Sequence, residues 1–131
     1  MSILTQEILG CLSPATKGAS GELLISITFP SEFSGFKGHF PGRPVLPGVC
    51  MIETVLVALG VYWGAPVTLR RLVSARWLAP VLPGEKIELA IRLKDGGHGA
   101  VQGKVSVTRK GERIAEFSMD VTGAPQGGCG S

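Results

Sequence analysis

One segment of this sequence is apolar around a whole helical circumference, and it limits the folds open to the chain. Residues 48–64 carry aliphatic or aromatic side chains with no polar stripe, and they include one acid, Glu53. A helix of this kind has to be surrounded by protein. The acid and the length, which falls short of the roughly 20 apolar residues of a span, argue against a membrane helix. The segment predicts a central buried helix enclosed by the rest of the chain.

Alternation of apolar and polar residues predicts strands on both sides of this helix. A short helix is expected first, over residues 4–12, with Thr5 among its capping residues. The expected strands cover residues 22–29 before the central helix and residues 67–78, 86–94, 101–108 and 115–121 after it. Glycine-containing turns at 82–84, 95–99 and 110–112 separate the last four, and such short connections join antiparallel neighbours.

These elements predict an α+β fold in which an antiparallel sheet curls around one buried helix. The chain has 131 residues and 44% hydrophobic residues, enough to bury one core. We expect a single domain over residues 1–122 and a flexible C-terminal tail over residues 123–131.

Charge and cysteine content exclude several classes of function. The net charge of +3 comes without a basic run, so nucleic acid is not an expected partner. Three cysteines without a CxxC pair predict neither a disulfide framework nor a metal site, and no cofactor is expected. The sequence shows no leader and no membrane span, which predicts a cytoplasmic protein.

Glu53 is the most informative residue, because an ionised carboxyl is costly to bury without a partner. A carboxyl inside an apolar helix is expected to be held protonated and to serve as an acid. The alternative is that Glu53 lies at the edge of the helix and extends into solvent. We favour the acid, since carboxyls are rarely buried without a task.

Two further positions lie just before or at the start of the central helix. His39 belongs to a Gly- and Pro-rich loop, where one histidine alone is a weak signal. Gly48 begins the helix, and the free N–H groups and positive dipole end of a helix favour a negatively charged oxygen. We predict an oxyanion site at Gly48; alternatively, the glycine is only a steric requirement of the turn.

The run His39-Phe40-Pro41-Gly42-Arg43-Pro44-Val45-Leu46-Pro47-Gly48, followed by Glu53, resembles the signature of the 3-hydroxyacyl-(acyl-carrier-protein) dehydratases of fatty-acid synthesis. These are the FabZ/FabA-like enzymes, which have the hot-dog fold. A weaker resemblance extends over residues 72–121. It implies dehydration of 3-hydroxyacyl thioesters, linked to acyl carrier protein or to CoA, to trans-2-enoyl thioesters.

The resemblance also implies roles for single residues. His39 would be the base that removes the C2 proton, and Glu53 the acid that protonates the leaving 3-hydroxyl. The N–H of Gly48 would hold the thioester oxygen, and the carbonyl of Val45 would orient the imidazole. The resemblance further implies a homo-oligomer built from dimers, in which His39 of one subunit faces Glu53 of the other.

Other residues are expected around this pair. The predicted substrate tunnel is lined by apolar side chains: Phe40, Pro47, Val49, Met51, Ile52, Leu56 and Val57. Members of the family often carry glutamine one helical turn after the acid, where this chain has Val57. An acidic carrier protein would meet basic side chains, for which the candidates are Arg43, Arg70, Arg71 and Arg76.

Several alternatives stay open. Cys50 stands in the first helical turn, where the pKa of a thiol can fall, so it is a candidate nucleophile. His98 belongs to a glycine-rich turn and is expected to be exposed. A hot-dog thioesterase is the main rival, because one fold supports several reactions. A non-catalytic, acyl-binding hot-dog subunit is the other, and the presence of both His39 and Glu53 argues against it.

Overall fold

The computed structural model describes residues 3–36, 46–97 and 99–123. Several predicted positions lie outside these ranges: His39, Phe40, Arg43, Val45, His98 and residues 124–131 of the predicted tail. The other candidate residues, Glu53 and Gly48 among them, lie inside.

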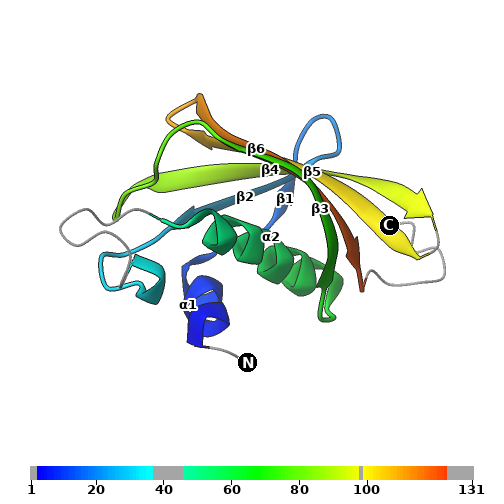
Figure 1. Ribbon diagram of the computed structural model, residues 1–131, viewed down its shortest axis with the longest axis horizontal. Helices are drawn as coiled ribbons and strands as arrows, with labels where there is room; N and C mark the ends of the chain where they lie inside the picture. Colours follow the sequence, from blue (N-terminus) through cyan, green and yellow to red (C-terminus); the bar gives the residue numbers. More distant parts are fainter. Residues whose placement is uncertain (1–2, 37–45, 98, 124–131) are drawn as a thin grey trace.

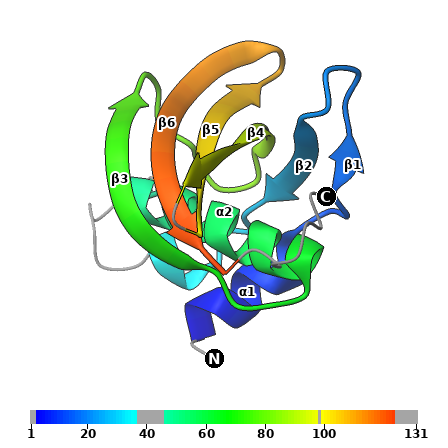
Figure 2. The same cartoon turned by 90° about the vertical axis from the view of Figure 1, so that its right-hand side faces the viewer.

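Within the described residues, six strands form one antiparallel sheet in the order β1-β2-β4-β5-β6-β3. Their bounds are β1 Thr16–Lys17, β2 Leu23–Thr28, β3 Thr68–Trp77, β4 Lys86–Gly97, β5 Ala100–Arg109 and β6 Glu112–Thr122. Figure 2 shows the sheet curling around the helix α2, Gly48–Trp63. The predicted α+β hot-dog architecture, a curved antiparallel sheet around a central helix, is confirmed.

The core lies between α2 and the concave face of the sheet. Each strand places alternate residues on this face, as in β2, where Leu23, Ile25 and Ile27 are buried. From α2, Val55 and Leu59 are fully buried against it. Full burial of one such side chain is worth about 1.5–3 kcal/mol, so the contact between helix and sheet is a main source of stability.

The predicted turn at residues 110–112 is a two-residue hairpin between β5 and β6. Lys110 and Gly111 both have positive φ, 52° and 81°, as a type I′ turn requires. The turn predicted to begin at residue 95 was placed too early. Strand β4 continues through Gly97, which pairs with Ala100 of β5.

Burial of α2 is incomplete in the described chain, which corrects the expectation of a helix surrounded on every side. The buried residues are Cys50, Met51, Thr54, Val55, Ala58 and Leu59. Val49 in the first turn is 69% exposed, and Val61 in the last turn is 62% exposed. The two ends of the helix are therefore left partly open in this single chain. No helix in the described residues is long and apolar enough to cross a membrane.

The helix α1, Ile3–Cys11, lies along the side of α2 that faces away from the sheet (Figure 1). Ile8 of α1 is fully buried in the core. Because α1 begins at Ile3, Thr5 is inside the helix and the prediction that it caps the helix is wrong. A short 3-10 helix, η1, Ser34–Phe36, follows β2. Neither η1 nor the two-residue strand β1 was predicted, since such short segments carry no periodicity.

Strand β3 forms one edge of the sheet and pairs with β6. Its burial does not alternate, and large apolar side chains along and just after it are exposed to solvent, namely Leu72, Val73, Trp77 and Leu78. A long edge strand with apolar side chains is a surface prone to pair with another chain.

Candidate active site

The first turn of α2 forms the centre of the candidate site. Pro47 precedes the helix with φ −64° and ψ 146°, and its side chain makes no capping hydrogen bond. The carbonyl oxygen of Pro47 accepts the N–H of Cys50 at 3.0 Å, which closes the first turn. The first N–H groups of a helix have no partner within the helix itself, so Gly48 and Val49 present N–H donors at this end.

An apolar groove of about 360 Å³ lies at this end of α2. It is lined by Leu46, Gly48, Met51, Trp77, Leu78, Ala79, Pro80 and Val81. The N–H of Leu46 donates to the carbonyl of Val81 at 2.9 Å, which ties the chain before the helix to the connection between β3 and β4. The groove is therefore built from two distant segments of the sequence.

The indole of Trp77 lies so close to the backbone at position 48 that it favours glycine there. A Cβ atom at position 48 would lie 2.6 Å from the indole carbon Cζ2 of Trp77, closer than real Cβ contacts come. The indole also packs on Phe117, with ring centroids 5.6 Å apart. Gly48 thus has a steric role, but the contact comes from the indole on β3 and not from the turn, as the alternative had it. The oxyanion role of the Gly48 N–H stays a prediction.

Glu53 is partly buried, which corrects the expectation of a fully enclosed carboxyl. Its Oε2 accepts a hydrogen bond from Oγ1 of Thr5 in α1 at 3.3 Å. The side chain therefore has a polar partner from a second helix, which the sequence did not predict.

The predicted tunnel residues do not converge on the apolar groove. Of those that the structure describes, Met51 lines it. Ile52, Leu56 and Val57 are partly buried against the core, Pro47 is partly buried, and Val49 is exposed. The larger groove residues, Trp77 and Leu78 above all, were missed. The signal available for them was the resemblance over residues 72–121, which identified the segment without placing its side chains.

Cys50 is a poor nucleophile in this environment. Its side chain is 3% exposed. Burial raises the pKa of the Cys50 thiol. A thiolate is therefore disfavoured, and the alternative of a Cys50 nucleophile is not supported.

Across residues 3–36, 46–97 and 99–123, histidine, cysteine and acidic side chains form no group of three that could hold a metal ion.

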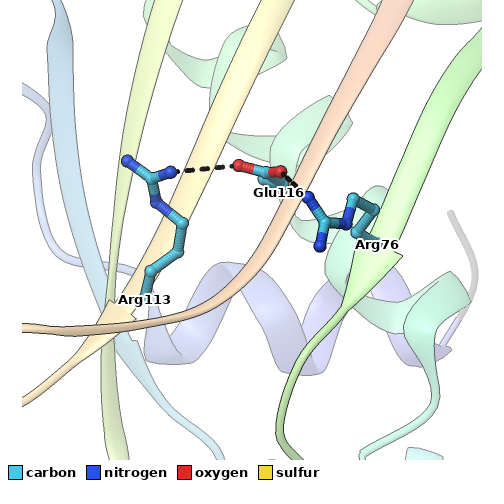
Figure 3. Close-up of polar contacts among 3 residues, drawn as sticks. All are labelled: Arg76, Arg113 and Glu116. Carbon is cyan, nitrogen blue, oxygen red and sulfur yellow. Dashed lines mark hydrogen bonds and ion pairs between the residues drawn. The ribbon is translucent and has the colours of Figure 1, made fainter.

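The three described candidate arginines lie on β3, and two of them form ion pairs. Figure 3 shows Arg76 and Arg113 on either side of Glu116, each with an N···O distance of 3.2 Å. Arg71 pairs with Asp120 at 3.2 Å. Arg70 is exposed. None of the three lines the apolar groove.

These ion pairs are open to solvent. The side chains of Arg71 and Arg76 are 70% and 69% exposed. Exposed pairs of this kind contribute about 0–1 kcal/mol, so they hold the arginines only weakly. The guanidinium groups therefore remain accessible to a partner.

Comparison with known proteins identifies the relatives of this chain. Residues 15–116 match the ApeI-like family, described as ApeI dehydratase. The 3-hydroxyacyl-(acyl-carrier-protein) dehydratase FabZ of Clostridium acetobutylicum is 32% identical over 101 residues, which are 72% of this chain and 70% of that protein.

Solved structures show the same fold. A chain of the dehydratase heterocomplex ApeI:P from Xenorhabdus doucetiae superposes with a TM-score of 0.65 at 19% identity, covering 82% of this chain and 93% of that one. The PaaI protein of E. coli superposes with a TM-score of 0.63 at 12% identity, covering 91% and 92%. The matched residues include His39, Gly48 and Glu53. The chain therefore belongs to the ApeI-like dehydratase family.

Proposed function

We propose that the protein converts 3-hydroxyacyl thioesters, linked to acyl carrier protein or CoA, to trans-2-enoyl thioesters in fatty-acid or specialised acyl synthesis. The observation that carries this proposal is the family match over residues 15–116, which spans both His39 and Glu53. The partly buried carboxyl of Glu53, on the central helix with a hydroxyl partner, supports its role as an acid.

In this reaction His39 acts as the base. Its imidazole takes the proton from C2, and the electron pair of that C–H bond forms the C2–C3 double bond as the C3–O bond breaks. Glu53 gives its proton to the departing hydroxyl, which leaves as water. The N–H of Gly48 stabilises the negative charge that develops on the thioester oxygen, and the carbonyl of Val45 orients the imidazole. One acid or base contributes about 10²–10⁴ in rate, and one oxyanion donor about 10²–10³.

The apolar groove is the proposed binding site of the acyl chain. One of its lining residues is Gly48, whose N–H would hold the thioester oxygen. Its lining is mostly aliphatic and aromatic, and its volume of about 360 Å³ lies in the range of small-ligand sites. A chain held there would displace water from the reacting carbons.

We also propose that the protein acts as a homodimer or an oligomer of dimers. The exposed apolar residues of the β3 edge, such as Leu72 and Val73, support pairing with a second copy. Val49 and Val61, exposed in the first and last turns of α2, offer further apolar surface for it. In this dimer His39 of one subunit would face Glu53 of the other.

We propose that the candidate arginines contact the acyl carrier protein. Arg70, Arg71 and Arg76 share β3, the strand that ends at the groove residue Trp77, and Arg43 belongs to the signature segment. Their positive charge suits an acidic carrier, mainly by raising the rate of encounter.

The proposal is tested by following the reverse reaction, hydration of a trans-2-enoyl thioester, by the loss of enoyl absorbance. His39→Ala and Glu53→Gln should each lower turnover by at least about 100-fold, because each removes one proton-transfer group. Glu88→Gln, at an exposed acid on β4, is the matched control and should keep wild-type turnover. Wild-type turnover in either site variant would contradict the assignment.

A thioesterase is the second candidate, and the products distinguish it. A thioesterase releases free thiol from a 3-hydroxyacyl thioester without forming an enoyl product, whereas a dehydratase keeps the thioester intact. A non-catalytic acyl-binding subunit would yield neither product under the same conditions.

A further inference from the structure

The carboxyl of Glu53 makes its hydrogen bond to a different helix. Oγ1 of Thr5 in α1 donates to Oε2 of Glu53 in α2 at 3.3 Å, in a partly buried position. The two residues are 48 positions apart in the sequence. The proposed proton transfers do not themselves involve this contact.

The helix α2 itself offers Glu53 little polar support. Side chains one turn away on a helix are those three or four positions before and after. For Glu53 these are Val49, Cys50, Leu56 and Val57. Three of them carry no donor, and a thiol is a weak one. The position of the carboxyl therefore depends on a group outside α2.

Helix α1 is held firmly enough to position that group. Ile8, one turn after Thr5, is fully buried in the core. Glu7 Oε1 accepts the N–H of Ser34 at 2.9 Å, which links α1 to η1. At the other end, the N–H of Ser13 donates to the carbonyl of Ser26 in β2 at 2.9 Å. Thr5 is thus carried by a helix anchored on two sides.

A second bond strengthens the anchor after α1. The N–H of Ser26 donates to the hydroxyl oxygen of Ser13 at 2.8 Å, so the two residues exchange two hydrogen bonds. The position of the Thr5 hydroxyl is therefore set by the tertiary structure, rather than by a freely moving N-terminal segment.

We propose that Thr5 is a positioning residue that selects which oxygen of Glu53 carries the transferable proton. This inference rests on the proposed dehydratase function. A protonated carboxyl has one O–H and one carbonyl-type oxygen that only accepts. A hydroxyl that donates to Oε2 makes Oε2 the accepting oxygen and leaves the proton on Oε1. In this way Thr5 leaves Oε1 of Glu53 to face the leaving hydroxyl, and it holds the Glu53 side chain in one rotamer.

The bond from Thr5 to Glu53 is long in this structure. A distance of 3.3 Å is longer than the usual 2.5–3.0 Å of O–H···O bonds. Hydrogen bonds in active sites are often long before substrate binds and shorten in the reacting complex. Loss of the hydroxyl should therefore lower the rate of the chemical step more than it weakens substrate binding.

The test compares Thr5→Val, which removes the hydroxyl at nearly constant shape, with Thr5→Ser, which keeps it. In hydration of a trans-2-enoyl thioester, Thr5→Val should lower kcat about 10-fold with an unchanged KM, the size expected for one hydrogen bond to a carboxyl group. Thr5→Ser should restore kcat to within about two-fold of wild type. Thr28→Val, at an exposed threonine of β2, is the matched control and should have no effect.

A second arm separates positioning from folding. Thr5→Val combined with Glu53→Gln should be no slower than Glu53→Gln alone, because the proposed effect of the hydroxyl on the rate requires that carboxyl. Rates are compared below the Tm of every variant. Wild-type kcat in Thr5→Val, equal losses in the Val and Ser variants, or additive losses in the double variant would each overturn the inference. An inactive wild-type enzyme would instead overturn the proposed function.

Discussion

Replacing Gly48 by alanine would place a methyl group 2.6 Å from Cζ2 of Trp77. Real Cβ atoms do not come this close, so the indole or the helix start must move. The indole is 46% exposed and can shift outward, but a shift weakens its packing on Phe117. Overpacking of this kind costs about 1–3 kcal/mol. Alanine is more favourable than glycine in a helix by about 0.5–1 kcal/mol, so the net loss should be about 0–2.5 kcal/mol.

The same substitution should have the opposite sign when the indole is absent. In a Trp77→Ala background the methyl group meets no ring, and only the helix-forming advantage of alanine remains. Gly48→Ala should then stabilise the protein by about 0.5–1 kcal/mol. Urea unfolding of the wild type, both single variants and the double variant measures all four free energies. If Gly48→Ala is equally destabilising in both backgrounds, the indole is not the reason for the glycine, and the account of the groove is wrong.

Two further predictions concern ionisable groups outside the proposed proton transfer. The N–H of Leu82 and, to a smaller extent, Arg109 lower the pKa of Glu85. The ionised carboxyl therefore stabilises the fold above the ordinary carboxyl pKa, and this stabilisation is lost as pH falls through the lowered pKa. Glu85→Gln should make Tm fall less steeply at acid pH, and an unchanged fall in Tm would contradict this. Cys50→Ala should keep dehydratase turnover, measured per folded enzyme, within about two-fold of wild type, because burial opposes formation of a thiolate. A loss as large as that of Glu53→Gln would instead indicate that Cys50 takes part in the reaction.

The regular elements could be predicted because their signals are local. Alternate residues of β2 face the core or the solvent, so burial follows the two-residue period of the sequence. The apolar circumference of residues 48–64 predicted a helix that the structure places over Gly48–Trp63. The exposure of Val49 and Val61 at the two ends of the helix was not foreseen, because the sequence does not say how much of the helix other elements cover.

The candidate site was predictable only in part. Glu53 and Gly48 were identified from their residue types and their position in the helix, whereas the pairing of His39 with Glu53 stays a prediction outside the described residues. Thr5 was assigned to a helix cap and instead contacts Glu53. No local pattern marks that contact, because it depends on the packing of α1 against α2.

From the sequence alone follow the alternating strands, the apolar central helix, the acid within it and the resemblance to a dehydratase signature. Each depends on residues that are neighbours along the chain or one turn apart. The tertiary structure decided the contacts between distant segments: Trp77 over Gly48, the groove beside them, and Thr5 on the carboxyl of Glu53. Such contacts depend on how the curved sheet and the anchored first helix pack onto α2. The periodicity of side chains along the sequence does not predict which distant residues come into contact.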